Sequence, residues 1–343
     1  MLVTGVNDFS SRILNQLYAS QNSTGNIAFS GISLYLLIGA INFGHQRASY
    51  NQLSQFLGED FEEFNSQEST YAGISWTYLN RLPHQISIST SALFYSCDML
   101  YRYKHVSNLL FTLQKIKVDF SNRVQSLNKI NEWIYDNTDG SIVNMFGDST
   151  WSDNTLIFIS TLFYRVDWRV NFISTQTYRE IFIDDQGQTL VVSMMNMEGY
   201  ERIHDFQKYN FRILFKPLSR ADYYSAIILP RDEYSQDILN DLKFDRFFNY
   251  FHQSQSKHIK IKLPKFKILS QNFLVETFKQ LGVTDIFDRN HSDFGEMTKE
   301  NVFVGNLIQI ANIIVEMLIS VYRHNNLRRQ WSSNIFTILT NFT

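Results

Sequence analysis

The chain has 343 residues, of which 44% are hydrophobic and 19% charged, and its net charge is -2 at pH 7. This composition excludes an intrinsically disordered protein and argues against general nucleic-acid binding, which usually requires a basic excess. The single cysteine, Cys97, excludes an internal disulfide. No metal-ligand or nucleophile spacing surrounds Cys97, so we interpret it as a packed core thiol.

The first part of the chain is predicted to be mainly helical. Residues 1–18 form an amphipathic helical pattern without the basic and apolar regions of a signal peptide. The run Ser30–Gln46 opens with a good N-cap residue, and its apolar part of about 15 residues suits a buried helix better than a membrane span. Residues 48–58 are predicted to form a short amphipathic helix that Gly58 closes.

The middle of the chain mixes strands and helices. Gln85–Ser96 alternates well enough to be a strand, and a helix and the short strand 115–120 follow it. Ser126–Phe146 is predicted to be an amphipathic helix that ends near Gly140. Asn154–Trp168 is apolar on both faces, which is typical of a central strand covered on both sides.

The later part is predicted to be rich in antiparallel strands, with several between Tyr178 and Leu229. Asp184 and Asp185 lie in "FIDDQGQT", where a hairpin turn is a simpler interpretation than paired carboxylates. Two short helices, one strand over 257–268 and a helix closed by Gly282 follow. Helices come first and strands later, with no alternating βαβ pattern, so the sequence predicts a single α+β domain over residues 1–343.

Signatures of catalysis and cofactor binding are absent from the sequence. It has no GxGxxG or GxxxxGK[ST] loop, no GxSxG elbow and no HExxH motif. The eight histidines are scattered, and His252 and His258 come closest to the spacing of metal ligands. We therefore predict that the protein is not an enzyme and has no catalytic residue, no metal site and no cofactor.

The stretch 301–331, "NVFVGNLIQIANIIVEMLISVYRHNNLRRQW", is the least ordinary part of the chain. Glu316 is its only formal charge before Arg323, which raises the question of a membrane anchor. Asn306, Gln309 and Asn312 would be costly in lipid, so we predict a buried strand and no membrane insertion.

Several segments resemble serpins, in the order of that family and over nearly the whole chain. The resemblance implies the serpin fold, with a large central β-sheet, additional sheets and about eight or nine helices. It places residues 301–316 at the fifth strand of the large sheet. The segments that carry it are "NIAFSGISLYLLIGAINFG", "INEWIYDNTDGSIVNMF", "LIFISTLFYRVDWRVNF", "SMMNMEGYERI", "AIILPRDEYSQDILNDL" and, as the most specific, "IKLPKFKILSQNFLVETFKQLGVTDIFD" followed by "SDFGEMT".

The sequence departs from the family pattern at several places. The Ser-Pro pair of the family is Ser30-Gly31 here, and an asparagine of its third strand is Ser160. Inhibitory serpins follow the fifth strand with a hinge of small residues that slides into the large sheet after cleavage, where its inward side chains must fit a closed interior. This chain has a degenerate hinge with large side chains at Glu316, Met317, Leu318 and Ile319.

Only 26 residues follow Met317, too few for a hinge, a bait loop and the closing strands of the family. In one alignment, "MLISVYRHNN", with Arg323 and His324, is the late apolar strand and the bait loop is deleted. In the other, "NIFTILTN" is that strand, and a short loop survives with Arg328 and Arg329 as protease-accessible bonds. We prefer the first alignment because it keeps the Arg-His pair of the family.

A lysine-rich strand, "KHIKIKLPKFK", carries a second candidate contact. Lys257, Lys260 and Lys262 form a possible polyanion-binding stripe, as some serpins bind glycosaminoglycans. The alternative is a solvated strand face with protective lysines.

The resemblance leads to two functional hypotheses. The first is a non-inhibitory serpin-fold protein that binds a host or endogenous protein, and the composition resembles the divergent serpins of poxviruses, which act on host inflammatory or cell-death signalling. The alternative is a serine or cysteine protease inhibitor, or a decoy substrate, with a shortened loop near Arg328-Arg329. We expect a cytoplasmic protein, or a secreted one if a signal peptide was removed.

Overall fold

The computed structural model describes residues 2–22, 25–61, 71–147, 151–184, 187–231, 238–317 and 335–339. These residues form two compact units. Unit 1 comprises residues 1–20, 27–164 and 269–312, and unit 2 comprises residues 21–26, 165–268 and 313–343. The prediction of one domain over 1–343 stays a prediction.

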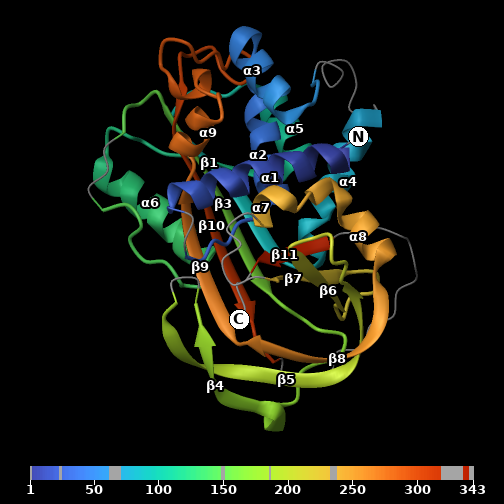
Figure 1. The fold of residues 1–343 in the computed structure, drawn as a ribbon. Coiled ribbons are helices and arrows are strands. Elements are labelled where there is room, and N and C mark those ends of the chain that lie inside the picture. Colours follow the sequence, from blue (N-terminus) through green and yellow to red (C-terminus); the bar gives the residue numbers. More distant parts are fainter. Residues whose placement is uncertain are drawn as a thin grey trace. The chain divides into compact units, whose positions relative to one another are not determined.

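Unit 1 contains most of the α-helices and one five-stranded sheet, in the strand order β2-β1-β3-β10-β9 (Figure 1). β1 runs antiparallel to β3 and parallel to β2. The strands are β1 (Ile88–Tyr95), β2 (Leu113–Lys117), β3 (Thr155–Arg165), β9 (Phe266–Phe273) and β10 (Phe303–Val315). The helices are α1 (Leu2–Ser20), α2 (Gly31–Asn42), α3 (Arg47–Leu57), α4 (Tyr71–Arg81), α5 (Tyr101–Phe111), α6 (Arg123–Asp136) and α9 (Val275–Gln280).

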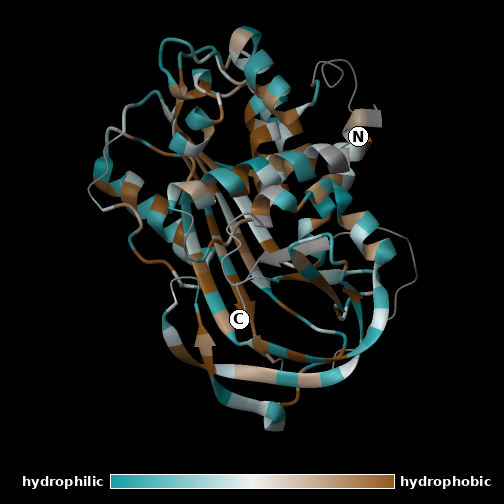
Figure 2. Cartoon of the chain, viewed as in Figure 1, coloured by the Kyte–Doolittle hydropathy of each residue, from teal (hydrophilic) through white to brown (hydrophobic). Residues whose placement is uncertain are grey.

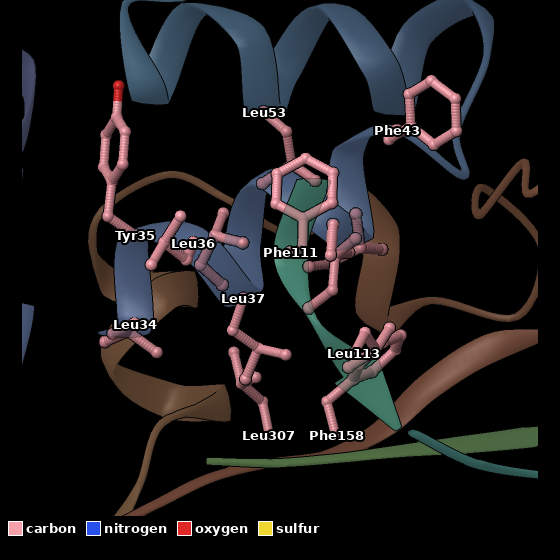
Figure 3. Close-up of a cluster of buried hydrophobic side chains, with 14 of the residues drawn as sticks. Leu34, Tyr35, Leu36, Leu37, Phe43, Leu53, Phe111, Leu113, Phe158 and Leu307 are labelled. Carbon is pink, nitrogen blue, oxygen red and sulfur yellow. The ribbon is translucent and has the colours of Figure 1, made fainter. Parts of the chain in front are cut away.

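Both faces of this sheet are buried, as the apolar pattern of Asn154–Trp168 predicts. Side chains on alternate positions of a strand point to opposite faces, so Phe158 packs into the core formed with α1 to α5 and Ile159 into the core under α6. Figure 3 shows the first core, in which Leu37 of α2 approaches Leu307 of β10 beside Phe158. The strands of the sheet are accordingly brown along much of their length in Figure 2.

Unit 2 contains a six-stranded sheet in the order β11-β7-β6-β5-β4, with β8 paired to β5. Aromatic side chains of α8 cover β6 and β7. The strands are β4 (Thr177–Ile183), β5 (Thr189–His204), β6 (Phe211–Pro217), β7 (Tyr224–Pro230), β8 (Gln255–Pro264) and β11 (Ile335–Leu339), and the helices are α7 (Ile238–Asp241) and α8 (Phe247–Gln253).

Several local predictions are confirmed. Ser30 is the N-cap of α2 and accepts a hydrogen bond from the Ser33 N–H, Gly58 closes α3 in the left-handed conformation, and Cys97 is a buried free thiol. Asp184 lies in the turn between β4 and β5, where its backbone N–H donates to the Gln188 carbonyl. The α+β fold class with a large sheet is also confirmed.

Several boundaries are wrong, among them that of the strand predicted over 115–120, which is β2 at Leu113–Lys117. Residues 257–268 were predicted as one strand, but β8 ends at Pro264 and β9 begins at Phe266 in the other sheet. The Lys265 N–H still donates to the Ser193 carbonyl of β5 over 2.9 Å, so the chain leaves this ladder just after Pro264. The helix predicted from Ser126 begins at Arg123 instead, since the Asn122 side chain caps it by accepting from the Gln125 N–H.

His45, just after α2, is buried without a charged partner at its ring. Its Nδ1 lies 2.8 Å from the Ile41 carbonyl oxygen, and its Nε2 has no hydrogen-bond partner among the described residues. Burial lowers the pKa of His45 to about 4, against smaller raising effects of the Ile41 hydrogen bond and of Asp293.

We predict that His45 makes the fold acid-sensitive. Because its folded pKa lies below the unfolded value, its contribution to stability is complete above about pH 6.5 and is lost as the pH falls toward 4, by roughly 3 kcal/mol. Urea unfolding from pH 7 to 4 should show a shallower loss of stability for His45→Gln than for the unmodified chain. Equal slopes would contradict the prediction.

Candidate functional site at the end of strand β10

β10 lies directly beside β3, and among the described residues no strand separates them. At one end the Phe303 N–H donates to the Asn154 carbonyl over 3.1 Å, and at the other the Val166 N–H donates to the Ile314 carbonyl over 3.0 Å. Both residue numbers rise together along the pair, so the two strands are parallel. The large sheet is therefore closed between these two central strands.

The described part of the degenerate hinge is held by side chains of unit 2. Glu316 forms an ion pair with Arg165, the last residue of β3. The Thr177 hydroxyl donates to the Met317 sulfur over 3.2 Å. Both hinge side chains are half-buried. Leu318 and Ile319 lie outside the described residues.

The candidate loop residues Arg323, His324, Arg328 and Arg329 also lie outside the described residues. β11 is described, and it runs parallel to β7 with Ile335 opposite Tyr224 and Leu339 opposite Ile228. This placement agrees with the second alignment of the tail, in which "NIFTILTN" is the late strand. It does not agree with the preferred alignment, in which "MLISVYRHNN" is that strand.

The polar residues in the apolar run of β10 all have partners, which the sequence could not name. Asn306 accepts from the Trp151 indole N–H over 2.8 Å, and the Asn312 amide donates to the Ser141 hydroxyl over 3.3 Å. No helix in the described ranges is long and apolar enough to cross a membrane.

Gln309 of β10 makes the most extensive of these contacts. Its Oε1 accepts from the Ser30 N–H over 2.8 Å and its Nε2 donates to the Ser30 carbonyl over 3.0 Å, all within the core. Gln309 is fully buried. Its amide thus satisfies the Ser30 N–H and shares the Ser30 carbonyl with the Leu34 N–H of α2.

β9 also contacts the chain that leads into α2, at Ala28, two residues before Ser30. The Ala28 N–H donates to the Ser270 hydroxyl, and the Asn272 amide donates to the Ala28 carbonyl, each over 2.8 Å. We call the segment 27–30 with Ser270, Asn272 and Gln309 the clasp. It ties the start of α2 to two strands of the large sheet.

One departure from the serpin pattern, Gly31, directly follows the clasp segment 27–30. A Cβ on Gly31 would lie 1.9 Å from the Ser10 hydroxyl of α1, so the larger proline of the family would not fit here without movement. The Ser160 hydroxyl of β3 is buried and has no hydrogen-bond partner among the described residues.

Unit 2 contains a second buried polar cluster, which the sequence did not indicate. Lys216 of β6 is fully buried, and its ammonium lies 3.0 Å from a carboxylate oxygen of Glu201. The faces of Trp168 and Phe172 lie 5.5 and 5.2 Å from the ammonium. Burial lowers the pKa of Lys216, while Glu201 opposes this shift. The segment after β3 is thereby packed against β6.

The lysine stripe lies on β8, and its three side chains are exposed. Lys262 is ion-paired with Glu180 at 2.6 Å, and Lys260 lies 3.8 Å from a carboxylate oxygen of Glu198. Two of the three lysines therefore face a carboxylate, which lowers the charge that Lys257, Lys260 and Lys262 offer to a polyanion.

Comparison with known proteins places this architecture in a family. The model of the serpin family (serine protease inhibitor) matches residues 4–317. Iripin-1 of Ixodes ricinus is 25% identical over 305 residues, which cover 87% of this chain and 77% of that protein. Serine protease inhibitor 42Dd of Drosophila melanogaster is 23% identical over 293 residues, or 83% of this chain and 76% of the relative.

Solved structures show the same fold. Native protease nexin-1 with heparin matches with a TM-score of 0.84 at 19% identity, covering 98% of this chain and 92% of that one. Human thyroxine-binding globulin complexed with its ligand matches with a TM-score of 0.80 at 17% identity, covering 98% and 91%. The fold is that of a serine protease inhibitor homologue, and the chain belongs to the serpin family.

We predict that the clasp depends on Gln309. In Gln309→Ala the Ser30 N–H loses its partner inside the core, while the Ser30 carbonyl keeps the Leu34 N–H, at a cost of about 2 kcal/mol in the free energy of unfolding. Gln271→Ala removes the same amide from an exposed position of β9 and should change it by less than about 0.5 kcal/mol. Urea unfolding measures both, and equal stabilities would contradict the role of the clasp.

A double-mutant cycle tests the buried ion pair. Lys216→Met or Glu201→Gln alone leaves one buried polar group without its partner, and each should destabilise the fold, with the loss of Lys216 costing about 3 kcal/mol. The double variant should recover a large part of that loss, because no charge remains unpaired. Additive effects in thermal or urea unfolding would show that the two residues act separately.

Proposed function

We propose that this serpin does not trap proteases and acts by binding another protein. The observation that carries the proposal is the end of β10, where large side chains at Glu316 and Met317 are followed in sequence by Leu318 and Ile319. Trapping in this family requires the hinge to enter the large sheet as a new strand.

Three physical costs oppose such insertion here. The hydrogen bonds between β3 and β10 must break. The Glu316–Arg165 ion pair and the Met317 contact with Thr177 must be released. The inserted side chains must also fit between two cores that are already closed on both faces of the sheet, and large side chains strain a packed interior.

The partner is a host or endogenous protein. The composition supports a role of the poxvirus type, in host inflammatory or cell-death signalling, while the matched relatives named above come from a tick and a fly. A cytoplasmic location, or a secreted one after signal removal, belongs to the same proposal.

A second candidate function follows from the names of the relatives. Serine protease inhibitor 42Dd is named as an inhibitor, and Arg328 or Arg329 would be the bond offered to a trypsin-like protease. A decoy substrate would be cleaved at the same bonds without forming a stable complex.

Incubation with serine and cysteine proteases separates these functions. We predict no complex that survives SDS, with serine protease inhibitor 42Dd and the same proteases run in parallel as the comparator. The double variant Arg328→Ala, Arg329→Ala tells whether any cleavage occurs at these arginines. A covalent complex of the unmodified chain that the double variant fails to form would establish the inhibitor function instead.

Limited proteolysis gives an independent prediction. A cleaved hinge that enters the sheet adds a strand and raises the melting temperature, whereas a hinge that stays out does not. We expect a shift of less than about 3 °C after cleavage, the size that about 1 kcal/mol produces in a large domain. Calorimetry before and after cleavage measures it, and a rise of tens of degrees would mean that the hinge inserts.

A further inference from the structure

The side chain of Lys115, in β2, ends between two neutral hydrogen-bond acceptors. Its nitrogen Nζ lies 2.8 Å from the Leu113 carbonyl oxygen and 3.2 Å from the hydroxyl oxygen of Ser107 in α5. The Ser107 hydroxyl already donates to the Tyr103 carbonyl, so it accepts from Lys115. Lys115 is half-buried, and Ser107 is fully buried.

Two acceptors suit a neutral amine better than an ammonium ion. A neutral amine has two N–H groups and one lone pair, whereas an ammonium has three N–H groups and no lone pair. When a neutral Lys115 donates to Leu113 and to Ser107, both N–H groups are satisfied and the lone pair stays free. In the ammonium form, the third N–H has no acceptor among the described residues.

The elements around Lys115 carry no acidic residue. α5, β1 and β2 contain no Asp or Glu, and the ionisable side chains of α5 and β1 are only tyrosines and bases. Leu93 of β1, a buried core residue, lies opposite Lys115, and Leu113, on the same face of β2, packs into the first core (Figure 3). The acidic residues of α6 are on the other face, where Gln114 accepts from the Trp133 N–H.

These surroundings favour the neutral, nucleophilic form of the amine. Burial lowers the pKa of Lys115 to about 8, and no neighbouring charge opposes this shift. At pH 7.4 about 20% of such a side chain is neutral, against about 0.1% of an ordinary lysine. A lysine that is desolvated in this way is an activated nucleophile.

We propose that Lys115 is a site of covalent acylation, the lysine of this chain that small activated acyl donors such as thioesters modify first. The Nζ lone pair attacks the acyl carbon, the carbon–sulfur bond breaks, and the thiolate leaves with the proton that the amine loses. The amide that forms keeps one N–H for one of the two acceptors. Ser107 is not the nucleophile, because it is fully buried and donates its proton to Tyr103. The inference does not depend on the proposed function.

Lys216 is the competing candidate in unit 2. Burial lowers its pKa as well. It is fully buried, however, and its ammonium is paired with Glu201. An acyl donor therefore reaches Lys115 and not Lys216.

Acetylation by S-acetyl-N-acetylcysteamine, a small thioester, tests the proposal. Lys117 is the internal control, because it lies on the same strand, is exposed and is paired with Asp98 at 2.9 Å, which raises its pKa. Mass-spectrometric fragmentation of the peptide that carries both lysines should show Lys115 acetylated at least about tenfold faster than Lys117 at pH 7.4. Equal rates at the two lysines, or faster acetylation of any other lysine, would overturn the inference.

The pH dependence of the two rates is a second test that needs no variant. The Lys115 rate should level off near pH 8, whereas the Lys117 rate should keep rising to about pH 10. A Lys115 rate that rises in parallel with that of Lys117 would contradict the proposal.

Ser107→Asp tests the part played by the neutral surroundings. The new carboxylate favours the ammonium form of Lys115, so acetylation of Lys115 at pH 7.4 should slow about fivefold relative to Lys117. An unchanged ratio in the folded variant would count against the proposal. If this variant does not fold, the pH profile of the unmodified chain decides the question.

Discussion

The pairing of β3 with β10 is the constraint on which the large sheet depends. Both strands are central, and each is buried on two faces by separate cores. A buried amide without a partner costs about 1–3 kcal/mol, so every polar side chain in the apolar run of β10 needs a defined contact. Asn306 and Gln309 have such contacts, and the Asn312 amide N–H has one although its Oδ1 has no partner among the described residues. These contacts tie β10 to the segments beside it.

The proposed function depends on the residues that follow the end of β10. The serpin family shares the architecture over residues 4–317, but at the end of the match this chain carries side chains that are large and already engaged. Glu316 is paired with Arg165, and Met317 lies against Thr177. Membership of the family therefore accounts for the fold, while the proposal of a binding function depends on the Glu316 and Met317 contacts at the end of β10.

The sequence predicted elements well where one physical signal dominated. Ser30 and Gly58 were read correctly as caps, because capping depends on a side chain or a backbone angle at a single residue. The reading failed at Pro264, where an apolar alternation continues through a change of sheet. Gln309 stood out as polar in an apolar run, but its partner Ser30 lies 279 positions away, a separation that no local pattern encodes.

The sequence by itself determined the fold class, the family and the large residues of the hinge, since these depend on periodicity, motif order and side-chain size. Only the tertiary structure decided that β3 and β10 are neighbours, that Gln309 satisfies the backbone of Ser30, and that Lys216 is buried against Glu201. The reason is that burial and pairing belong to contacts between distant segments. The sequence gives the residue type of a lysine or glutamine, but its burial and its hydrogen-bond partners are set only when the chain folds.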